Sequence, residues 1–419
     1  MKPDTPIAIS RQQFEDAAAR IAPLVLRTPL VHSPTLSRMF DSDIYLKLEN
    51  LQKTGSFKIR GASYKILTRL KRITGGVVAA SAGNHAQGVA LAASRAGIES
   101  TIVMPEWTSI SKQEATRSYG GQIVLHGKSV GESLEKAMEI AAQGKTLIHP
   151  YDDLDIIIGQ GTLGLEILED LPEAQMIIAP VGGGGLISGL ALAAAAVGSI
   201  ARIIGVQTVV CPSAANALRR GKIKTVHARP SIADGINVRQ VGKLNFKIMQ
   251  ALVQHIALVD ETSIASAILL LLERKKILAE GAGAVPLAGI LGGAVSIPKN
   301  SKVVLVISGG NLDSPLLGRI LHHGMLINGR IMRIQMQLDD TPGALARLLS
   351  LVAKHKANVL HISHDRNVTH IPFFVTSVSL ELETRGASHI QELFEEIQKA
   401  GYAIYGRHHT DDLLPSSTD

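Results

Sequence analysis

The chain of 419 residues contains 46% hydrophobic and 3% aromatic residues, 39 glycines and a formal net charge of +7. This length allows two or three domains with a deeply buried site, and the apolar content excludes an intrinsically disordered protein. The single cysteine, Cys211, excludes an intrachain disulfide and a thiolate metal cluster and favours a reducing compartment. We therefore expect a cytoplasmic protein.

The basic excess does not by itself predict a nucleic-acid partner. A nucleic-acid-binding face gathers lysine and arginine and adds aromatic side chains for stacking, whereas this chain has one tryptophan. Its basic residues are spread over short runs such as LTRLKR (67–72) and ERKK (273–276), which are typical of solvated helix faces. An anionic ligand is compatible with the charge.

Short apolar strands alternate with helical stretches from about residue 40 to residue 320. The predicted strands are residues 75–82, 100–106, 176–182, 201–208 and 302–310. Nearly continuous apolar strands that are separated by helices predict an α/β fold, in which a parallel sheet is covered on both faces. Ligands of such sheets bind at the carboxyl ends of the strands.

The pattern changes at about residue 328. Predicted strands occupy 330–340, 359–366 and 373–386, and the first and third of them alternate apolar and polar residues. Predicted helices occupy 341–358 and 388–401. The resulting order β-α-β-β-α-β predicts a ferredoxin-like α+β domain. We expect the tail at 407–419 to be flexible.

The stretch LQKTGSFKIRGA (51–62) places Lys58 between Phe57 and Ile59. One interpretation is a solvated lysine whose stem lies over apolar neighbours. The other is a desolvated amine with a lowered pKa, as a Schiff-base nucleophile requires. Arg60 would lower this pKa further if its side chain pointed the same way. The stretch by itself leaves both interpretations open.

Two further turns follow predicted strands. SAGNHAQG (81–88) leads into a helix, where Asn84 either caps the helix or binds a ligand hydroxyl. His85 is either a general base or a histidine satisfied by its surroundings. VISGGN (306–311) ends a strand in a serine hydroxyl that would lie at the mouth of a site, although Ser-Gly-Gly is also an ordinary turn.

VGGGGLISG (181–189) places four consecutive glycines before a helix. Such a run exposes backbone N–H groups that can bind a dianionic phosphate. A flexible linker is the alternative, but both flanks are strongly structured. The spacing matches neither fingerprint for nucleotide or dinucleotide phosphates, so ATP and NAD are not supported.

Residues 181–200 carry no charge and approach the length of a membrane span. The glycines and alanines of this stretch instead predict a buried helix after a turn, so we expect no membrane partner.

An imine-forming amine, a phosphate nest and a partner for a ring hydroxyl are together the requirements of pyridoxal 5′-phosphate. The motifs KTGSFKIRGA, SAGNHAQG, GGGGLISG, ADGI, AEGAGA and SGGN, in this order, resemble the threonine dehydratase (threonine ammonia-lyase) branch of the fold-type II pyridoxal phosphate enzymes. The C-terminal stretch DTPGALARLLSLVAKHKANVLHISHDR resembles one ACT domain. The resemblance implies a two-lobed catalytic domain like the tryptophan synthase β chain at 1–325, with a small lobe at about 50–150, and an ACT regulatory domain at 328–406.

The resemblance also implies roles for individual residues. Lys58 would hold the cofactor and move the Cα proton, with Phe57 packed beside the ring. The other cofactor-binding residues would be Asn84 at the ring hydroxyl, Gly182, Gly183, Gly184 and Gly185 at the phosphate, and Ser308 at the pyridine nitrogen. Ser81, Gly83 and His85 would lie near the substrate carboxylate.

The implied reaction converts L-threonine to 2-oxobutanoate and ammonia, with L-serine giving pyruvate as a side activity. The alternatives are a dehydratase of serine or 3-hydroxyaspartate, a serine racemase, and an amino-acid-sensing protein without catalysis. Racemases of the family carry a serine where this chain has Ala82, which disfavours racemisation. Metal-binding members carry a carboxylate where this chain has Gln207, so we expect no metal.

The resemblance to an ACT domain implies an effector site near Asp340, Gly343 and Leu345. Isoleucine or valine would be the effector, as suits isoleucine biosynthesis. The alternative is a structural dimerisation unit. Both the family and the module imply a homo-oligomer, either a dimer or a tetramer.

Overall fold

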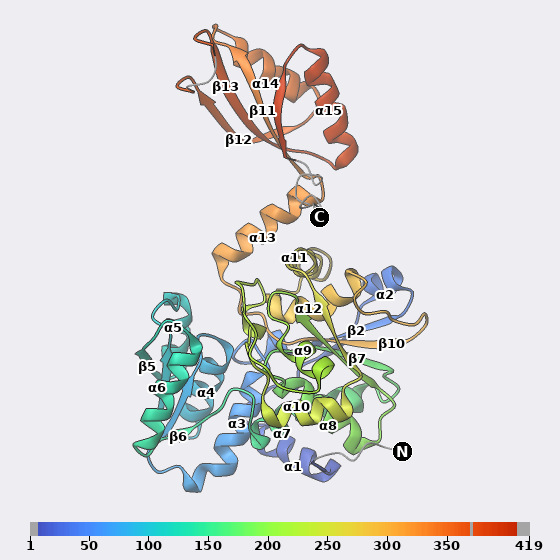
Figure 1. Ribbon diagram of the computed structural model, residues 1–419. Coiled ribbons are helices and arrows are strands. Elements are labelled where there is room, and N and C mark those ends of the chain that lie inside the picture. Colours follow the sequence, from blue (N-terminus) through green and yellow to red (C-terminus); the bar gives the residue numbers. More distant parts are fainter. Residues whose placement is uncertain (1–6, 369–371, 409–419) are drawn as a thin grey trace. The chain divides into compact units, whose positions relative to one another are not determined.

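The computed structural model describes residues 7–368 and 372–408, with residues 407 and 408 described by their backbone alone. The chain divides into two compact units, residues 1–316 and 317–419 (Figure 1). The division falls within helix α13 (Ser314–Ile327), upstream of the boundary expected from the sequence. The first unit contains two lobes, each built around its own sheet.

The large lobe contains a six-stranded sheet. In spatial order its strands are β1 (Leu30–His32), β2 (Asp43–Leu48), β10 (Lys302–Ile307), β7 (Met176–Pro180), β8 (Arg202–Thr208) and β9 (His255–Val259). All neighbours pair in parallel except β1, which runs antiparallel to β2. The connection from β1 to β2 holds only one short helix, and a parallel crossover needs a longer one.

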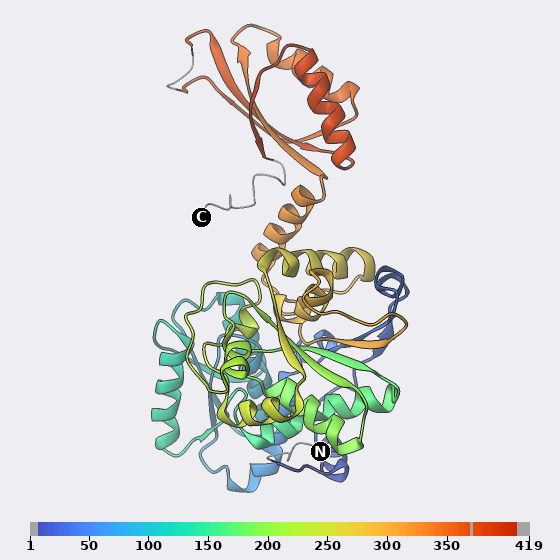
Figure 2. The ribbon, with the colours of Figure 1, turned by 45° about the vertical axis from the view of Figure 1, so that its right-hand side comes forward.

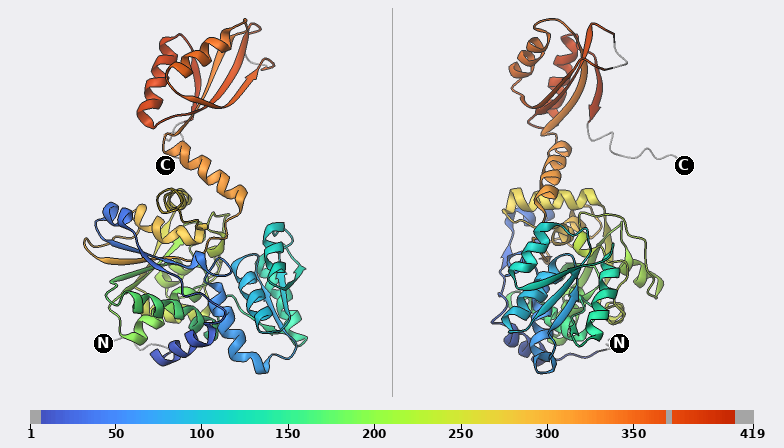
Figure 3. Two further views of the ribbon diagram at one scale, coloured as in Figure 1. Left: turned by 180° about the vertical axis from the view of Figure 1, so that it is seen from behind. Right: turned by 90° about the vertical axis from the view of Figure 1, so that its left-hand side faces the viewer.

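The small lobe contains a four-stranded parallel sheet, which faces the viewer in the right panel of Figure 3. Its spatial order is β5 (Gly121–Leu125), β4 (Ser100–Met104), β3 (Val77–Ala80) and β6 (Thr146–Leu147). The apolar runs predicted β3 and β4, and likewise β7, β8 and β10 of the large lobe. They did not reveal β5 or β6, nor the strands β1, β2 and β9.

Helices cover both sheets of the first unit. They are α1 (Arg11–Ile21), α2 (Pro34–Phe40), α3 (Lys58–Arg69), α4 (Asn84–Arg95), α5 (Ile110–Ser118), α6 (Val130–Ala142), α7 (Leu154–Asp170), α8 (Gly185–Val197), α9 (Ser213–Arg220), α10 (Lys243–Leu252), α11 (Glu261–Leu270) and α12 (Gly281–Leu291).

Helices α7 and α8 form the centre of the large lobe. Leu163, Ile187 and Leu190 are buried and pack with the apolar sheet residues Ile177 and Val304 in one core cluster. The uncharged stretch therefore forms a buried helix, as its composition predicted. Among the described residues, no helix combines the length and apolar character that crossing a bilayer requires.

The second unit follows the predicted order β-α-β-β-α-β. Its elements are β11 (Ile331–Asp339), α14 (Ala344–Lys354), β12 (Asn358–Asp365), β13 (Val375–Glu383), α15 (Ala387–Lys399) and β14 (Ile404–His408). The strands form an antiparallel sheet in the order β12-β13-β11-β14, with both helices on one side (Figure 2). Beyond β14, residues 409–419 of the expected tail lie outside the described residues.

Candidate active site

The lysine segment is fixed against the carboxyl end of β10. The backbone N–H of Phe57 donates to the carbonyl of Ser308 at 3.1 Å, and that of Gly310 donates to Gly55 at 2.9 Å. Helix α3 begins directly afterwards, at Lys58. The stretches KTGSFKIRGA and VISGGN, far apart in sequence, therefore meet where ligands of parallel sheets bind.

The amine of Lys58 lies in a partly buried environment. Its Nζ donates to the carbonyl of Pro150 at 3.0 Å and lies 5.2 Å from the ring centroid of Phe57. Burial lowers the pKa of Lys58 to about 8, although the Glu280 carboxyl acts in the opposite direction. The geometry thus favours the desolvated amine over the solvated lysine.

Arg60 does not contribute to this lowered pKa, because its side chain points elsewhere. Its guanidinium is fully buried and pairs with Glu49 at 2.8 Å and Glu166 at 2.6 Å. Lys47, which is also buried, pairs with Glu166 at 2.7 Å. Two cations and two carboxylates therefore balance within the core and join the start of α3 to β2 and α7.

Asn84 is the first residue of α4, while Gly83 is the N-cap. The interpretation of Asn84 as a simple N-cap is therefore wrong. Its Nδ2 instead donates to both carboxyl oxygens of Glu280, at 2.7 and 3.0 Å. Its Oδ1 accepts from Nδ2 of Asn311 at 2.8 Å. The side chain thus faces two residues of the other lobe: Asn311, which follows β10, and Glu280, which precedes α12.

Glu280 is a site residue that the sequence analysis missed. The side chain is buried, and its backbone N–H donates to the carbonyl of Gly309 at 3.0 Å. Burial raises the pKa of Glu280 to about 7, although the hydrogen bond from Asn84 lowers it. The available signal was a single carboxyl within the small, apolar stretch AEGAGA (279–284).

The loop that we expect near the substrate carboxylate has room for a ligand. A Cβ built on Gly83 would meet no atom within 4 Å, and the Gly83 N–H donates to Oγ of Ser81 at 3.2 Å. His85 is buried, with Nε2 at 2.9 Å from the carbonyl of Ile148. Burial lowers the pKa of His85 to about 3, so the ring is neutral and a weak base.

The glycine turn presents a run of free amides. In the part of the chain that the structure describes, the N–H groups of residues 182–184 donate to no carbonyl or side chain. The first turn of α8, which begins at Gly185, adds further unpaired N–H groups. Gly184 adopts φ +98°, a conformation that favours glycine. These features fit a bound phosphate.

The segment at 148–152 links the lysine to this turn, and the sequence analysis missed it as well. Pro150 accepts from Lys58, and a Cβ built on Gly183 would lie 2.3 Å from the ring of Tyr151. Nδ1 of His149 accepts from the N–H of Asp152 at 2.8 Å. The polar letters HPYDD were its only signal.

The residues present fit pyridoxal phosphate, with one departure. Lys58 supplies a partly deprotonated amine, and the turn at 182–185 supplies the anion nest. Ser308 is buried, and its hydroxyl forms no hydrogen bond with any residue in the described ranges. The departure concerns Asn84, because both of its Nδ2 contacts already go to Glu280 and a cofactor hydroxyl would have to share that donor.

Gln207 uses its amide to hold the backbone. Nε2 donates to the carbonyl of Val181 at 3.1 Å, and Oε1 accepts from the N–H groups of Ala214 and Ala215 at the start of α9. Within the described ranges, no three His, Cys, Asp or Glu side chains gather in a way that could hold a metal ion.

The three residues expected near an effector line one hollow of about 350 Å³ in the second unit. The hollow lies where β11 meets α14 and is lined by Leu338, Asp339, Asp340, Thr341, Pro342, Gly343, Ala344, Leu345, His364 and Arg366. Nε of Arg366 lies 2.9 Å from Oδ1 of Asp340. A carboxylate and a guanidinium thus stand side by side at an otherwise partly apolar hollow.

Comparisons with known proteins agree with this geometry. The family model "Pyridoxal-phosphate dependent enzyme" matches residues 21–309. The L-threonine ammonia-lyase of Thermotoga maritima is 45% identical over 399 residues, covering 94% of this chain and 99% of that protein. The structure of threonine deaminase isoform 2 from Solanum lycopersicum is 33% identical with a TM-score of 0.70, covering 77% of this chain and 96% of that one. The serine racemase structure from maize is 37% identical with a TM-score of 0.71, covering 76% and 98%.

Proposed function

The chain belongs to the pyridoxal-phosphate dependent enzyme family, and we propose that it is an ammonia-lyase acting on L-threonine. The reaction eliminates water and later takes it up again, so that threonine gives 2-oxobutanoate and ammonia. The observation that carries the proposal is the partly buried amine of Lys58, linked through residues 150 and 151 to the free amides at 182–184. The names of the Thermotoga maritima and Solanum lycopersicum relatives support threonine as the substrate.

Lys58, Asn84, Ser308 and the turn at 182–185 would hold the cofactor, which supplies an electron-withdrawing ring that acidifies the Cα proton of the substrate. The role of Lys58 is to accept this proton. With a pKa of about 8, a useful fraction of its amine is neutral near pH 7.5, whereas an ordinary lysine would be almost wholly protonated.

Glu280 adjusts the charge around Asn84. Because its pKa is raised to about 7, the carboxyl still holds a proton in a substantial fraction of molecules near neutral pH. In that form it accepts from Asn84 without placing a full negative charge beside the substrate. The neutral ring of His85 keeps its proton on Nε2 for the carbonyl of Ile148, so it orients the loop rather than moving a proton.

A serine racemase is the second candidate, because the maize enzyme has a closely similar fold and 37% identity. The residue two positions before Asn84 is Ala82, which has no hydroxyl to deliver a proton from the opposite side of the substrate. Elimination is therefore the proposed main reaction, with serine as a slower substrate. Chiral analysis of the serine left after incubation distinguishes the two activities.

We propose that the second unit is an ACT-type regulatory module whose hollow binds isoleucine or valine. The strand and helix order, the antiparallel sheet and the position of the hollow after β11 support this assignment. Asp340 would pair with the ammonium of the effector and Arg366 with its carboxylate. The alignment with the Thermotoga maritima relative is longer than the first unit, so that relative shares sequence with the second.

The test measures 2-oxobutanoate release from L-threonine by the holoenzyme and by Lys58→Ala. We expect steady release by the holoenzyme, none above background by Lys58→Ala, and unchanged release by Lys71→Ala, which removes an exposed lysine. If a 2-oxo acid is released from serine or 3-hydroxyaspartate but not from threonine, the substrate is one of those amino acids instead of threonine. Retained activity in Lys58→Ala would overturn the proposal.

A further inference from the structure

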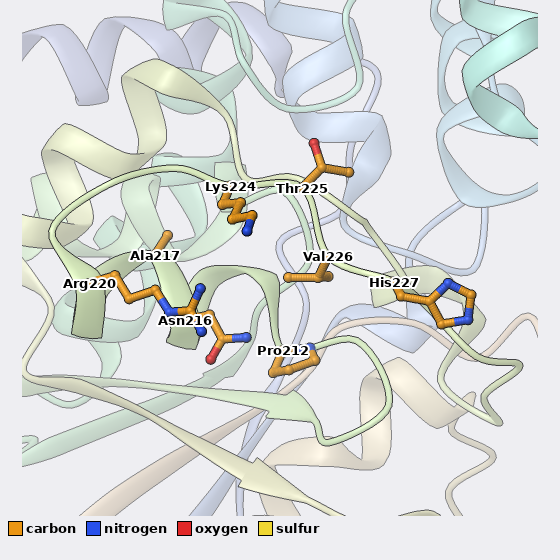
Figure 4. Close-up of a pocket in the computed structure, with 8 residues that line it drawn as sticks. All are labelled: Pro212, Asn216, Ala217, Arg220, Lys224, Thr225, Val226 and His227. Carbon is orange, nitrogen blue, oxygen red and sulfur yellow. The ribbon is translucent and has the colours of Figure 1, made fainter.

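A pocket of the first unit, apart from the candidate active site, has a volume of about 310 Å³ and no role in the proposed reaction. It is lined by Pro212, Asn216, Ala217, Arg220, Lys224, Thr225, Val226 and His227 (Figure 4). Helix α9 forms one wall, and the chain that follows the helix forms the other. The site residues described above do not line it.

The pocket carries an unbalanced positive charge. The run RRGKIKTVHAR (219–229) contains five lysines and arginines and no carboxylate, so the basic residues are less evenly spread than the sequence analysis concluded. Within the described ranges, the side chains of Arg220, Lys224 and His227 form no ion pair or hydrogen bond. Like charges held together without a counter-charge create a local positive potential that attracts anions.

The donors of this pocket converge. In Figure 4 the side chains of Arg220, Lys224 and Asn216 point toward one space, while Thr225 points away from it. Oδ1 of Asn216 already accepts from Arg219 at 2.7 Å, so its Nδ2 is the group left to bind a ligand. A guanidinium, an ammonium and an amide N–H together suit an anion with several acceptor oxygens, such as a phosphate group.

The remaining lining is apolar. Pro212, Ala217 and Val226 contribute hydrocarbon surface beside the donors. An inorganic anion would leave this surface exposed to water, whereas a phosphate ester with a compact apolar body would cover it. The pocket therefore favours a small phosphate monoester over free phosphate.

The outer wall of the pocket is joined to the glycine turn. The N–H of Val226 donates to the carbonyl of Arg239 at 2.9 Å. Just before Arg239, Val238 packs on the turn, because a Cβ built on Gly182 would lie 3.2 Å from its Cγ2. An occupant that restrains the wall would thus restrain the turn.

We propose that this pocket binds a small phosphate monoester and that its occupancy slows loss of the cofactor. The first half is independent of the proposed function. The second half rests on the proposed role of the turn at 182–185 in holding the cofactor phosphate.

The binding test uses phenyl phosphate and the holoenzyme, whose glycine turn is already occupied, in calorimetric titrations at constant ionic strength. We expect Arg220→Gln and Lys224→Gln each to weaken binding by about tenfold, as loss of a charge-assisted hydrogen bond does. Lys222→Gln, which neutralises an exposed lysine of the same run outside the lining, should change it less than about twofold.

Two further probes identify the ligand class. Inorganic phosphate should bind more weakly than phenyl phosphate, since it leaves the apolar wall bare. Equal affinities for the two would assign the pocket to free phosphate and overturn the proposal that its ligand is a monoester. Absence of phenyl phosphate binding, or equal weakening by Lys222→Gln, would overturn the site altogether.

The coupling test follows the cofactor absorbance that remains after transfer of the holoenzyme to cofactor-free buffer. Phenyl phosphate that saturates the wild type should slow its cofactor loss at least about twofold, and Lys224→Gln should need about tenfold more phenyl phosphate for the same effect. If phenyl phosphate binds without changing this rate, the proposed effect on cofactor loss is overturned, while the proposed binding site stands. Neither binding nor cofactor loss depends on threonine turnover. Failure of the proposed reaction is therefore distinguishable from failure of the proposed pocket.

Discussion

Asn84 and Glu280 join the two lobes of the first unit through their side chains. Nδ2 of Asn84 lies 2.7 and 3.0 Å from the two carboxyl oxygens of Glu280, across a sequence separation of 196 residues. Asn84 begins α4 of the small lobe, and Glu280 directly precedes α12 of the large lobe. A carboxyl whose pKa is raised to about 7 therefore lies at the junction of the lobes.

The first prediction concerns stability in the variant Glu280→Gln. Since folding raises the pKa of Glu280 from 4.5 to about 7, its contribution is fully present below pH 4.5 and is lost as the pH rises to 7. Glutamine does not titrate. The stability of the wild type relative to the variant should therefore fall by roughly 2–3 kcal/mol between pH 4.5 and pH 7.5, at 1.36 kcal/mol per pKa unit.

Urea unfolding of both proteins across this pH range measures the difference. A difference that stays constant with pH would show that Glu280 titrates normally in the folded state.

The second prediction concerns the pH dependence of cofactor attachment to Lys58. Burial lowers the pKa of its amine to about 8, so the reactive neutral form should grow as the pH rises, with a midpoint near 8. The rate at which cofactor-free protein attaches pyridoxal phosphate, followed by absorbance, measures this midpoint. Glu280→Gln should move it to lower pH, because the Glu280 carboxyl raises the pKa of Lys58. A midpoint near pH 10 would contradict the lowered pKa of Lys58.

The third prediction concerns Gly183→Ala. The added methyl group would lie 2.3 Å from the ring of Tyr151, so the turn or the ring must shift. Overpacking of this kind costs about 1–3 kcal/mol, which corresponds to roughly a fivefold to hundredfold loss of cofactor affinity if the turn is what moves. Gly131→Ala is the matched control, since its methyl group would meet only Oγ of Ser129 at 3.6 Å. Cofactor affinity is measured by equilibrium dialysis. An unchanged affinity in Gly183→Ala would show that the turn does not bind the cofactor.

The fourth prediction concerns Asp340→Asn and the proposed effector. If Asp340 binds the ammonium of isoleucine, neutralising it should weaken isoleucine binding about tenfold in calorimetry. The exposed pair with Arg366 contributes little to stability, so the fold should persist. Glu395→Gln, which alters an exposed carboxylate of α15, should leave binding unchanged. Equal binding by Asp340→Asn would exclude the hollow as the effector site.

The sequence predicted the parts of the fold that bury continuous apolar runs. Strand β2 was missed because its buried residue Lys47 breaks the apolar pattern. The partners that explain this burial are the carbonyl of Thr28 and the carboxylate of Glu166, which lies far along the chain. Strand β6 was missed because it has only two residues.

The same limit applies to the site. The glycine turn was recognisable because its local sequence determines its chemistry. Glu280 and Tyr151 were not, because their roles depend on partners that the fold brings together over long sequence separations.

The pairing of β2 with β10 has a consequence for synthesis of the chain. The strands of the small lobe, from β3 to β6, lie within residues 77–147 and can pair soon after they leave the ribosome. Strand β2 instead has no parallel neighbour until residues 302–307 have been made. The lysine segment gains its anchor at Ser308 only then, so a nascent chain should be unable to retain its cofactor until most of the first unit is complete.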